Sequence, residues 1–372
     1  MCLLTNHEED SSMFSKKMIK FQGVFLFLCL LATLGGKALA AEYWVWVGAA
    51  NMTMIDGNNV PVWGFGLDKD HNFLTTGDFT VSVPGPTLRV GPDDTTLIIH
   101  LKNNLGEPVS LNILGQRLTN NSGPVWTNFP EDTQTWSGSR PAGNYTARVR
   151  SFSHETMPGE VGEYRWESFR PGTFLLQSGT NPAKQVQMGM YLPVVKDVEE
   201  GKAYKDVPYD KEMVVVFHEI DPVINQAIAA GTYGAVQGAT IGSSVLFEPK
   251  YFLMNGMSYP SEGILSINGK MTLLKDARLL IRFLNAGLYT HVPQVLGTYL
   301  TMWAEDGNRY RYPREAHGFE LNSAKTIDAI LVSSEGPPWR IPLYDARLNF
   351  NNNGTHFGGM LSYIKSILPD YR

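Results

Sequence analysis

The side chains best suited to chemistry in this sequence are candidate metal ligands, and they are sparse. Beyond residue 41 the chain has no cysteine, because Cys2 and Cys29 both precede that point. That part therefore cannot form disulfides, iron–sulfur clusters or blue-copper centres, and it offers no thiolate for catalysis. Seven histidines remain there, and no two have the short spacing that places a ligand pair on one strand or helix: His71, His100, His154, His218, His291, His317 and His356.

Isolated histidines and paired methionines are the remaining candidates for metal binding. His291, at the end of a predicted strand, and His154, beside Glu155, are each interpreted as a hydrogen-bonded structural histidine, with metal ligation as the alternative. Thioethers bind Cu(I), and alternate residues of a strand share one face. Methionine is also a common core filler, so both interpretations stay open for three pairs: Met52/Met54, Met188/Met190 and Met254/Met257.

Composition and charge exclude several classes of function. The formal net charge is −5 and no block of five Lys or Arg residues occurs, so the sequence shows no basic patch of the kind that binds nucleic acid. Charged residues make up 18% and hydrophobic residues 43% of the chain, which excludes a disordered charged tail and allows a sizeable core. The sequence contains no nucleophile elbow, no Walker loop and no dinucleotide-binding glycine motif.

Residues 1–41 have the pattern of a secretory signal peptide. Three lysines precede an apolar run over 23–34, and Ala38-Leu39-Ala40 is a small-residue cleavage signal, so we expect cleavage after Ala40 or Ala41. A membrane anchor would need about 20 apolar residues, and this run is shorter. We therefore expect export to the periplasm, the cell surface or the medium, with no membrane span in the mature chain.

The elements that must position any site are mostly strands. Hydrophobic runs rich in β-branched and aromatic residues predict five of them, at 43–47, 95–101, 213–218, 278–284 and 327–333. A single helix is expected over 222–230, closed by Gly231. Many strands separated by turn signals indicate an all-β fold of two Greek-key β-sandwich domains. The charged segment 196–212 is predicted as the linker between domains at 42–195 and 213–372.

Several motifs in both predicted domains resemble the multicopper oxidases, the laccase-like family of cupredoxin domains. The first domain carries VPGPTLRV, NNL, RPGTF and QMGMY, at residues 83–90, 103–105, 170–174 and 187–191. The second carries four further segments similar to the family's middle domain, at 267–269, 281–287, 304–307 and 324–328. The resemblance implies two cupredoxin-like domains and, in an intact member, copper bound through histidine pairs.

The histidine pairs are missing at the positions that the resemblance assigns to them. Where the family has His-x-His-Gly, this chain has Asn112, Ile113, Leu114 and Gly115; where it has His-Ser-His, this chain has Gln177, Ser178 and Gly179. The family's later His-Cys-His cluster is also absent. We therefore expect no copper and no other cofactor. The former ligand positions Asn112, Leu114, Gln177 and Gly179 should still lie together on neighbouring strands, with the two amides hydrogen-bonded to the backbone or to each other.

Two functional hypotheses follow. The first is an exported, non-catalytic binding or structural module of the cell envelope, because a fold that has lost its site residues does not keep their chemistry. The alternative is a copper-binding protein or copper-dependent oxidoreductase whose ligands are the methionine pairs with His291, His317 or His356. Under the first hypothesis, we expect self-association or docking to another envelope protein through two segments, 117–169 and 349–359. The first of these segments contains Trp126 and Trp136.

Overall fold

The computed structural model describes residues 39–74, 80–128, 134–143, 146–234, 236–261, 265, 274–332, 339–355 and 358–366. Ala40–Arg372 form one compact unit. The predicted signal peptide lies outside the described residues except for its last three positions. In the described ranges, no helix is both long enough and apolar enough to cross a membrane.

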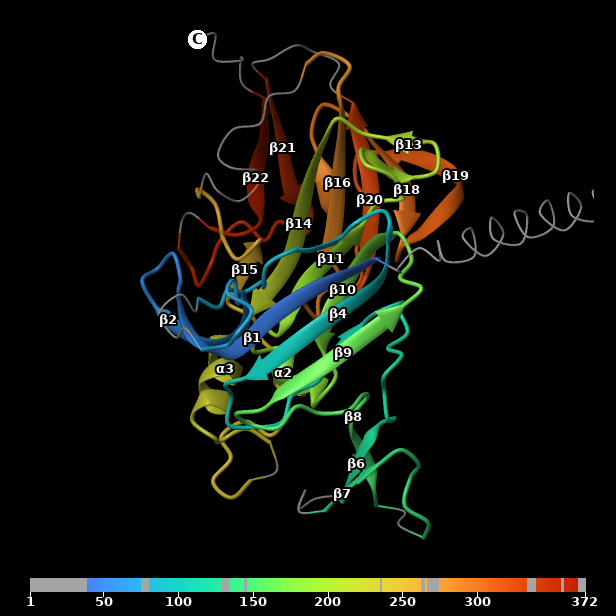
Figure 1. The fold of residues 1–372 in the computed structure, drawn as a ribbon. Coiled ribbons are helices and arrows are strands. Elements are labelled where there is room, and N and C mark those ends of the chain that lie inside the picture. The colour runs from blue at the N-terminus through green and yellow to red at the C-terminus, as the bar shows by residue number, and fades with distance from the viewer. Residues whose placement is uncertain are drawn as a thin grey trace, which may run out of the picture. The chain divides into compact units, whose positions relative to one another are not determined.

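A first β-sandwich, called here sandwich 1, is built from two four-stranded sheets (Figure 1). One sheet has the strand order β2-β1-β4-β9 and the other has the order β3-β11-β10-β5. The strands are β1 (Leu39–Thr53), β2 (Asn59–Leu67), β3 (Leu88–Val90), β4 (Asp94–Asn103), β5 (Leu111–Ile113), β9 (Val161–Glu167), β10 (Gly172–Ser178) and β11 (Tyr191–Lys196).

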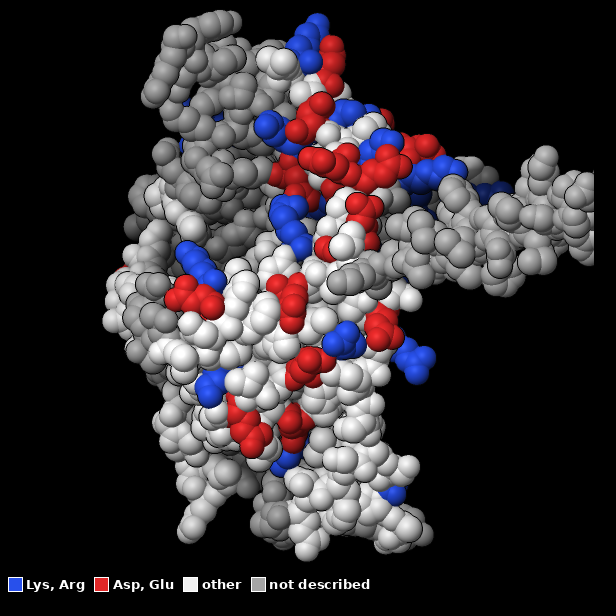
Figure 2. Space-filling model, in the orientation of Figure 1, with Lys and Arg blue, Asp and Glu red and all other residues white. Residues whose placement is uncertain are grey.

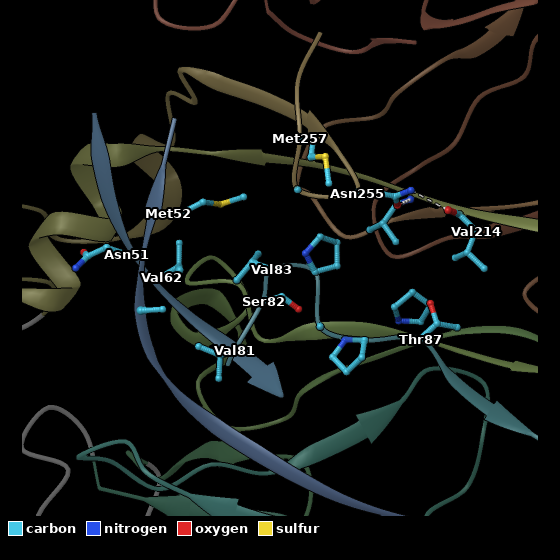
Figure 3. A pocket seen from close by; sticks show the side chains of 17 residues that line it. Asn51, Met52, Val62, Val81, Ser82, Val83, Thr87, Val214, Asn255 and Met257 are labelled. Carbon is cyan, nitrogen blue, oxygen red and sulfur yellow. Dashed lines mark hydrogen bonds between the residues drawn. The ribbon is translucent and has the colours of Figure 1, made fainter. Parts of the chain in front are cut away.

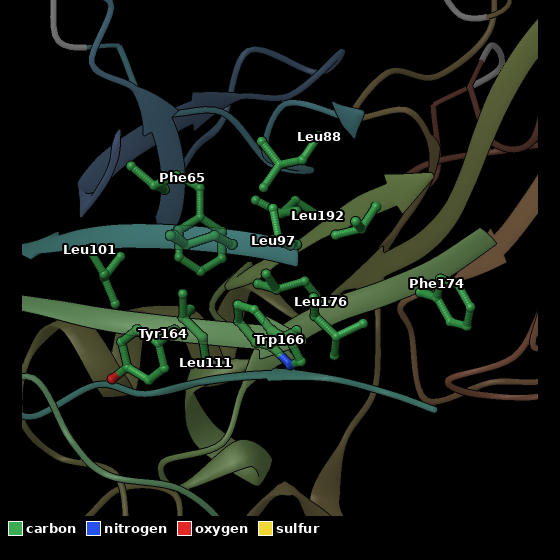
Figure 4. Close-up of a cluster of buried hydrophobic side chains, with 14 of the residues drawn as sticks. Phe65, Leu88, Leu97, Leu101, Leu111, Tyr164, Trp166, Phe174, Leu176 and Leu192 are labelled. Carbon is green, nitrogen blue, oxygen red and sulfur yellow. The ribbon is translucent and has the colours of Figure 1, made fainter. Parts of the chain in front are cut away.

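The core of sandwich 1 follows from the period-two pattern of its strands. In β4, Leu97, Ile99 and Leu101 alternate onto the inner face and are fully buried. Figure 4 shows Leu97 and Leu101 among the other buried side chains of this cluster, with Trp166 near its centre. The cluster contains side chains of both sheets, such as Leu97 and Trp166 of one and Phe174 of the other, so this core holds the two sheets together.

A second β-sandwich, sandwich 2, follows in the sequence. Its six-stranded sheet has the order β15-β14-β16-β20-β18-β19, and its three-stranded sheet has the order β17-β21-β22. The strands are β14 (Lys211–Ile220), β15 (Tyr251–Met254), β16 (Arg278–Asn285), β17 (Pro293–Val295), β18 (Leu300–Glu305), β19 (Asn308–Ala316), β20 (Thr326–Val332), β21 (Trp339–Asp345) and β22 (Leu361–Ser366).

Smaller elements connect or extend the sandwiches. A three-stranded sheet of order β7-β6-β8 extends from sandwich 1 in Figure 1 and comprises β6 (Val125–Thr127), β7 (Thr135–Ser137) and β8 (Arg148–Ser151). A short helix, α2 (Pro182–Gln185), separates β10 from β11, and a 3-10 turn spans Ser244–Leu246. Helix α3 (Pro222–Ala229) begins at Asp221, whose carboxylate accepts the N–H groups of Val223 and Ile224.

The all-β prediction is confirmed, and four of the five predicted strands lie within β1, β4, β14 and β16. The fifth, 327–333, matches β20 as far as Val332, and residue 333 lies outside the described residues. The predicted helix corresponds to α3. The segment proposed as a linker forms a hairpin of β12 (Lys202–Tyr204) and β13 (Val207–Pro208), whose buried Ala203 and Val207 pack with Leu280 and Ile330. The connection between the sandwiches is therefore packed against sandwich 2 through its few apolar residues. The division into domains at 42–195 and 213–372 remains a proposal.

Candidate functional site

The four former ligand positions lie together at the ends of two neighbouring strands. Asn112 of β5 and Gln177 of β10 are direct cross-strand partners. Just beyond β5, the Leu114 N–H donates to the Leu175 carbonyl at 3.0 Å, and just beyond β10, the Gly179 N–H donates to the Ser110 carbonyl at 3.2 Å. The juxtaposition that the motifs predict is therefore present, although the imidazoles are not.

The side chains at these positions fill the space differently from four imidazoles. A Cβ atom built on Gly179 would lie 2.1 Å from the Asn112 Nδ2 atom, so the amide already occupies the room that a side chain at 179 needs. Asn112 and Gln177 are half-buried, and neither side chain takes part in the hydrogen bonds found among the described residues. The expected amide hydrogen bonds are thus not made, because partial exposure leaves both amides open to solvent.

Leu114 has become part of the apolar contact between the two sandwiches. It packs against a cluster that contains Val83 and Leu175 from sandwich 1 and Val216 and Leu284 from sandwich 2. Burial of the isobutyl group of Leu114 stabilises the fold, whereas burial of an imidazole at this position would cost free energy through desolvation. Leu114 therefore has a packing role in this structure.

Beside Gly179, buried hydroxyl groups satisfy one another. The Thr180 Oγ1 atom lies 3.0 Å from both the Ser110 and Ser151 Oγ atoms, and those two atoms are 2.8 Å apart. The Phe152 N–H, just beyond β8, donates to the Gly179 carbonyl at 3.1 Å. The chain leaving β8 thus lies along the segment that follows β10. The network continues to a charged pair, because the Thr180 hydroxyl also lies 3.2 Å from an oxygen of Glu155, which is ion-paired with Arg150.

His291 is held between two carboxylates and has no free nitrogen. Its Nε2 atom lies 3.0 Å from a Glu219 oxygen and its Nδ1 atom 2.9 Å from an Asp345 oxygen, and all three side chains are fully buried. Burial lowers the pKa of His291, but the hydrogen bonds and charges of both carboxylates outweigh it and raise the pKa to about 9. Gly287 permits this approach, because a Cβ there would lie 1.8 Å from a Glu219 oxygen.

His218 is the neutral counterpart of His291. Its Nε2 atom accepts the Gly256 N–H at 3.1 Å, and its Nδ1 atom lies 2.7 Å from the Tyr191 hydroxyl oxygen. Burial, reinforced by the positive charge of His291, lowers the pKa of His218 to about 3. The neutral ring therefore carries its proton on Nδ1 and donates it to Tyr191.

Two of the other histidines, His71 and His100, pack on the Trp44 ring, with ring centroids 4.2 and 4.7 Å away from it. His154 stacks on Tyr164 with ring centroids 4.4 Å apart, and its Nε2 atom lies 2.9 Å from the Glu163 carbonyl. His317 is exposed, and His356 lies outside the described residues. Among the described residues, no group of three or more His, Cys, Asp or Glu side chains is arranged to hold a metal ion.

The methionine pairs mostly serve the core. Met188 and Met190 are fully buried in two different apolar clusters, and Met54 and Met254 are buried in two others. The two remaining members, Met52 and Met257, come from different pairs and line one cavity. The structure therefore does not place any predicted pair as two exposed ligands on one face.

A buried ionic cluster, which sequence reasoning missed, joins the sandwiches. Arg282 is fully buried and forms ion pairs with Glu212, Asp197 and Asp328. The Thr173 hydroxyl of β10 lies 3.0 Å from an Arg282 nitrogen and donates to Asp328 at 2.5 Å. An arginine inside the apolar run of β16 is a sequence signal for such a cluster, because a buried guanidinium needs carboxylate partners.

Solved structures identify the fold. The blue copper oxidase from Nitrosomonas europaea matches 88% of this chain and 86% of its own, with a TM-score of 0.62 and 15% identity. The multicopper oxidase mgLAC matches 89% of each chain, with a TM-score of 0.61 and 18% identity. This chain has the cupredoxin fold. Copper nitrite reductase from Nitrosomonas europaea shares it over 89% of this chain and 95% of its own, with a TM-score of 0.58 and 17% identity.

At these identities the likeness establishes the fold alone. No family model matches the sequence, and no curated protein matches it. The similar structures nevertheless cover both sandwiches and are named as copper proteins, so copper is the group whose fit must be tested. An amide, an isobutyl group, a second amide and a glycine do not fit copper at the former ligand positions, because copper at such centres takes imidazole.

Proposed function

We propose that this chain is an exported cupredoxin-fold protein that has lost its copper chemistry and acts as a binding or structural module of the cell envelope. The observation that carries the proposal is the combination of backbone register and side chains at the former ligand positions. Their backbone register is kept between β5 and β10, while their side chains are a half-exposed amide pair, an interface leucine and a glycine. The signal-peptide pattern supports export.

The alternative, a copper protein with a site unlike that of the family, has less support. Both nitrogens of His291 are engaged with carboxylates, which removes it as a ligand. Met52 and Met257 are the methionines that share a cavity, and two thioethers alone make a weak site. A copper site of this kind is therefore an outcome of the test below and not our proposal.

The small sheet β7-β6-β8 supports a role in protein contact. Trp126 and Trp136 are direct cross-strand partners, and Val149 of β8 lies opposite Trp126 on its other side. Nearby, Phe152 is 58% and Met157 45% exposed. In Figure 2, the viewed surface over β6–β8 carries few charged side chains. Aromatic residues and methionine are enriched in interface cores, so we propose self-association, or docking to another envelope protein, through this sheet.

Oxidase turnover provides the functional test. The mature protein, preincubated with Cu(I) and Cu(II) and then desalted, is assayed for dioxygen consumption with phenolic substrates. The blue copper oxidase from Nitrosomonas europaea serves as the positive control. We expect no turnover above that of free copper at matched concentration. Copper-dependent turnover that survives desalting and is abolished by Met52→Leu or Met257→Leu would favour the alternative.

A contact role for β7-β6-β8 has its own test. Light scattering of the mature protein should show a species larger than the monomer, either alone or with envelope extract. Trp126→Ala with Trp136→Ala should return it to the monomer. A monomer that never associates, and that behaves identically with and without both tryptophans, would contradict this part of the proposal.

A further inference from the structure

A cavity of about 490 Å³ lies between sandwich 1 and sandwich 2. Figure 3 shows its walls coming from distant parts of the chain, with Met52 and Val62 on one side, Val83 in the middle and Met257 opposite. Five parts of the chain line the cavity. They are Ala50, Asn51, Met52 and Val62 of the β1-β2 hairpin, the segment 81–87, Pro193 of β11, Val214 and Val216 of β14, and Asn255, Gly256 and Met257 after β15.

The lining is uncharged. Among the residues that the structure describes, none that lines the cavity carries an ionisable side chain, and most are valine, proline, methionine or alanine. Of its polar side chains, the Asn255 amide is already used: its oxygen accepts the Val216 N–H at 2.8 Å and its nitrogen donates to the Val214 carbonyl at 2.9 Å. Such walls offer little to an ion and favour an apolar ligand.

The cavity is held open by rigid elements. The Gly85 N–H donates to the Tyr191 carbonyl at 2.9 Å, and the Ser82 N–H donates to the Phe65 carbonyl at 3.0 Å, which fixes the segment 81–87. On the opposite wall, Gly256 has a φ of 77° and donates to His218. A Cβ at 256 would lie 2.4 Å from the Val83 carbonyl oxygen, so the walls approach closely there. Pre-formed walls lower the cost of binding.

We propose that this cavity binds an uncharged, largely apolar small molecule that carries an aromatic or alicyclic ring. Its volume lies within the range of roughly 300–1,000 Å³ that is typical of small-molecule sites. The thioethers of Met52 and Met257 adapt to irregular shapes and make favourable contacts with aromatic rings. Since none of Asn112, Leu114, Gln177 and Gly179 lines the cavity, this inference is independent of the copper question.

The test uses N-phenyl-1-naphthylamine, an uncharged fluorescent probe, titrated into the mature protein. We expect a saturable increase of fluorescence with one site per chain. Met257→Lys, which places a cation in the wall, should weaken binding by about tenfold or more. Met257 is 40% exposed, so the variant should fold, and Met257→Leu should keep the affinity of the natural chain.

Leu288→Lys is the matched control, because Leu288 is 44% exposed and does not line the cavity. It should bind the probe as the natural chain does. The proposal is overturned if fluorescence rises without saturation, or if Leu288→Lys and Met257→Lys lose the probe equally. Equal binding of an anionic naphthalene sulfonate at the same site would also overturn it, since that would show an unselective apolar surface.

Discussion

Replacing His291 by Gln probes a fully buried histidine that lies between two carboxylates. In the folded chain, the pKa of His291 rises to about 9 against an ordinary 6.5. Because the folded pKa is the higher one, the imidazolium contributes fully below pH 6.5, and its contribution is lost as the pH rises through about 9. This difference in pKa corresponds to about 3 kcal/mol of stability.

The variant should lose more than this contribution. His291→Gln leaves Glu219 and Asp345 buried without their cation, and breaking a buried ion pair costs about 3–5 kcal/mol. The assay is urea unfolding followed by tryptophan fluorescence at about pH 6 and about pH 9.5. We expect the deficit of the variant to be large at the lower pH and to shrink at the higher one.

The matched control is His317→Gln, because His317 is exposed. It should leave both the free energy of unfolding and its pH dependence unchanged. If His291→Gln keeps the alkaline loss of stability seen in the natural chain, the titration belongs to another group and the reasoning fails.

Three further predictions concern other buried groups. His218→Phe should remove an acid-side loss of stability, because a pKa lowered to about 3 makes the natural chain less stable as the pH falls below 6.5; urea unfolding between about pH 4 and 6.5 checks this. Gly179→Ala should destabilise by about 1–3 kcal/mol through overcrowding, and less when Asn112 is also alanine, as a double-mutant cycle of unfolding free energies would show. Arg282→Met should cost about 3–5 kcal/mol in urea unfolding, and Asp328→Asn in that background should recover part of it.

The sequence carried enough information for the strands and for the former ligand positions. Strand β4 reads as an apolar run with buried Leu97, Ile99 and Leu101, so local pattern alone defines it. Asn112 and Gln177 could be placed together because each is flanked by residues of a recognisable motif. That pairing is a property of the backbone register, which does not depend on the side chains at the two positions.

The polar clusters and the cavity could not be predicted in the same way, because their members are distant in sequence. His291 is 72 residues from Glu219 and 54 from Asp345, and no local pattern links them. The carboxylate of Glu219 within an apolar strand indicates that it needs a buried partner. It does not indicate which residue that partner is. The cavity likewise depends on how one sandwich packs against the other, which no single segment encodes.

The copper content of the mature protein tests the central claim most directly. The protein is purified without a metal-binding tag, incubated with excess Cu(I) or Cu(II), desalted, and analysed by mass spectrometry under native conditions. We expect an unloaded chain with no tightly held copper. One or more copper atoms retained per chain, and released when Asn112 and Gln177 are replaced by alanine, would contradict it.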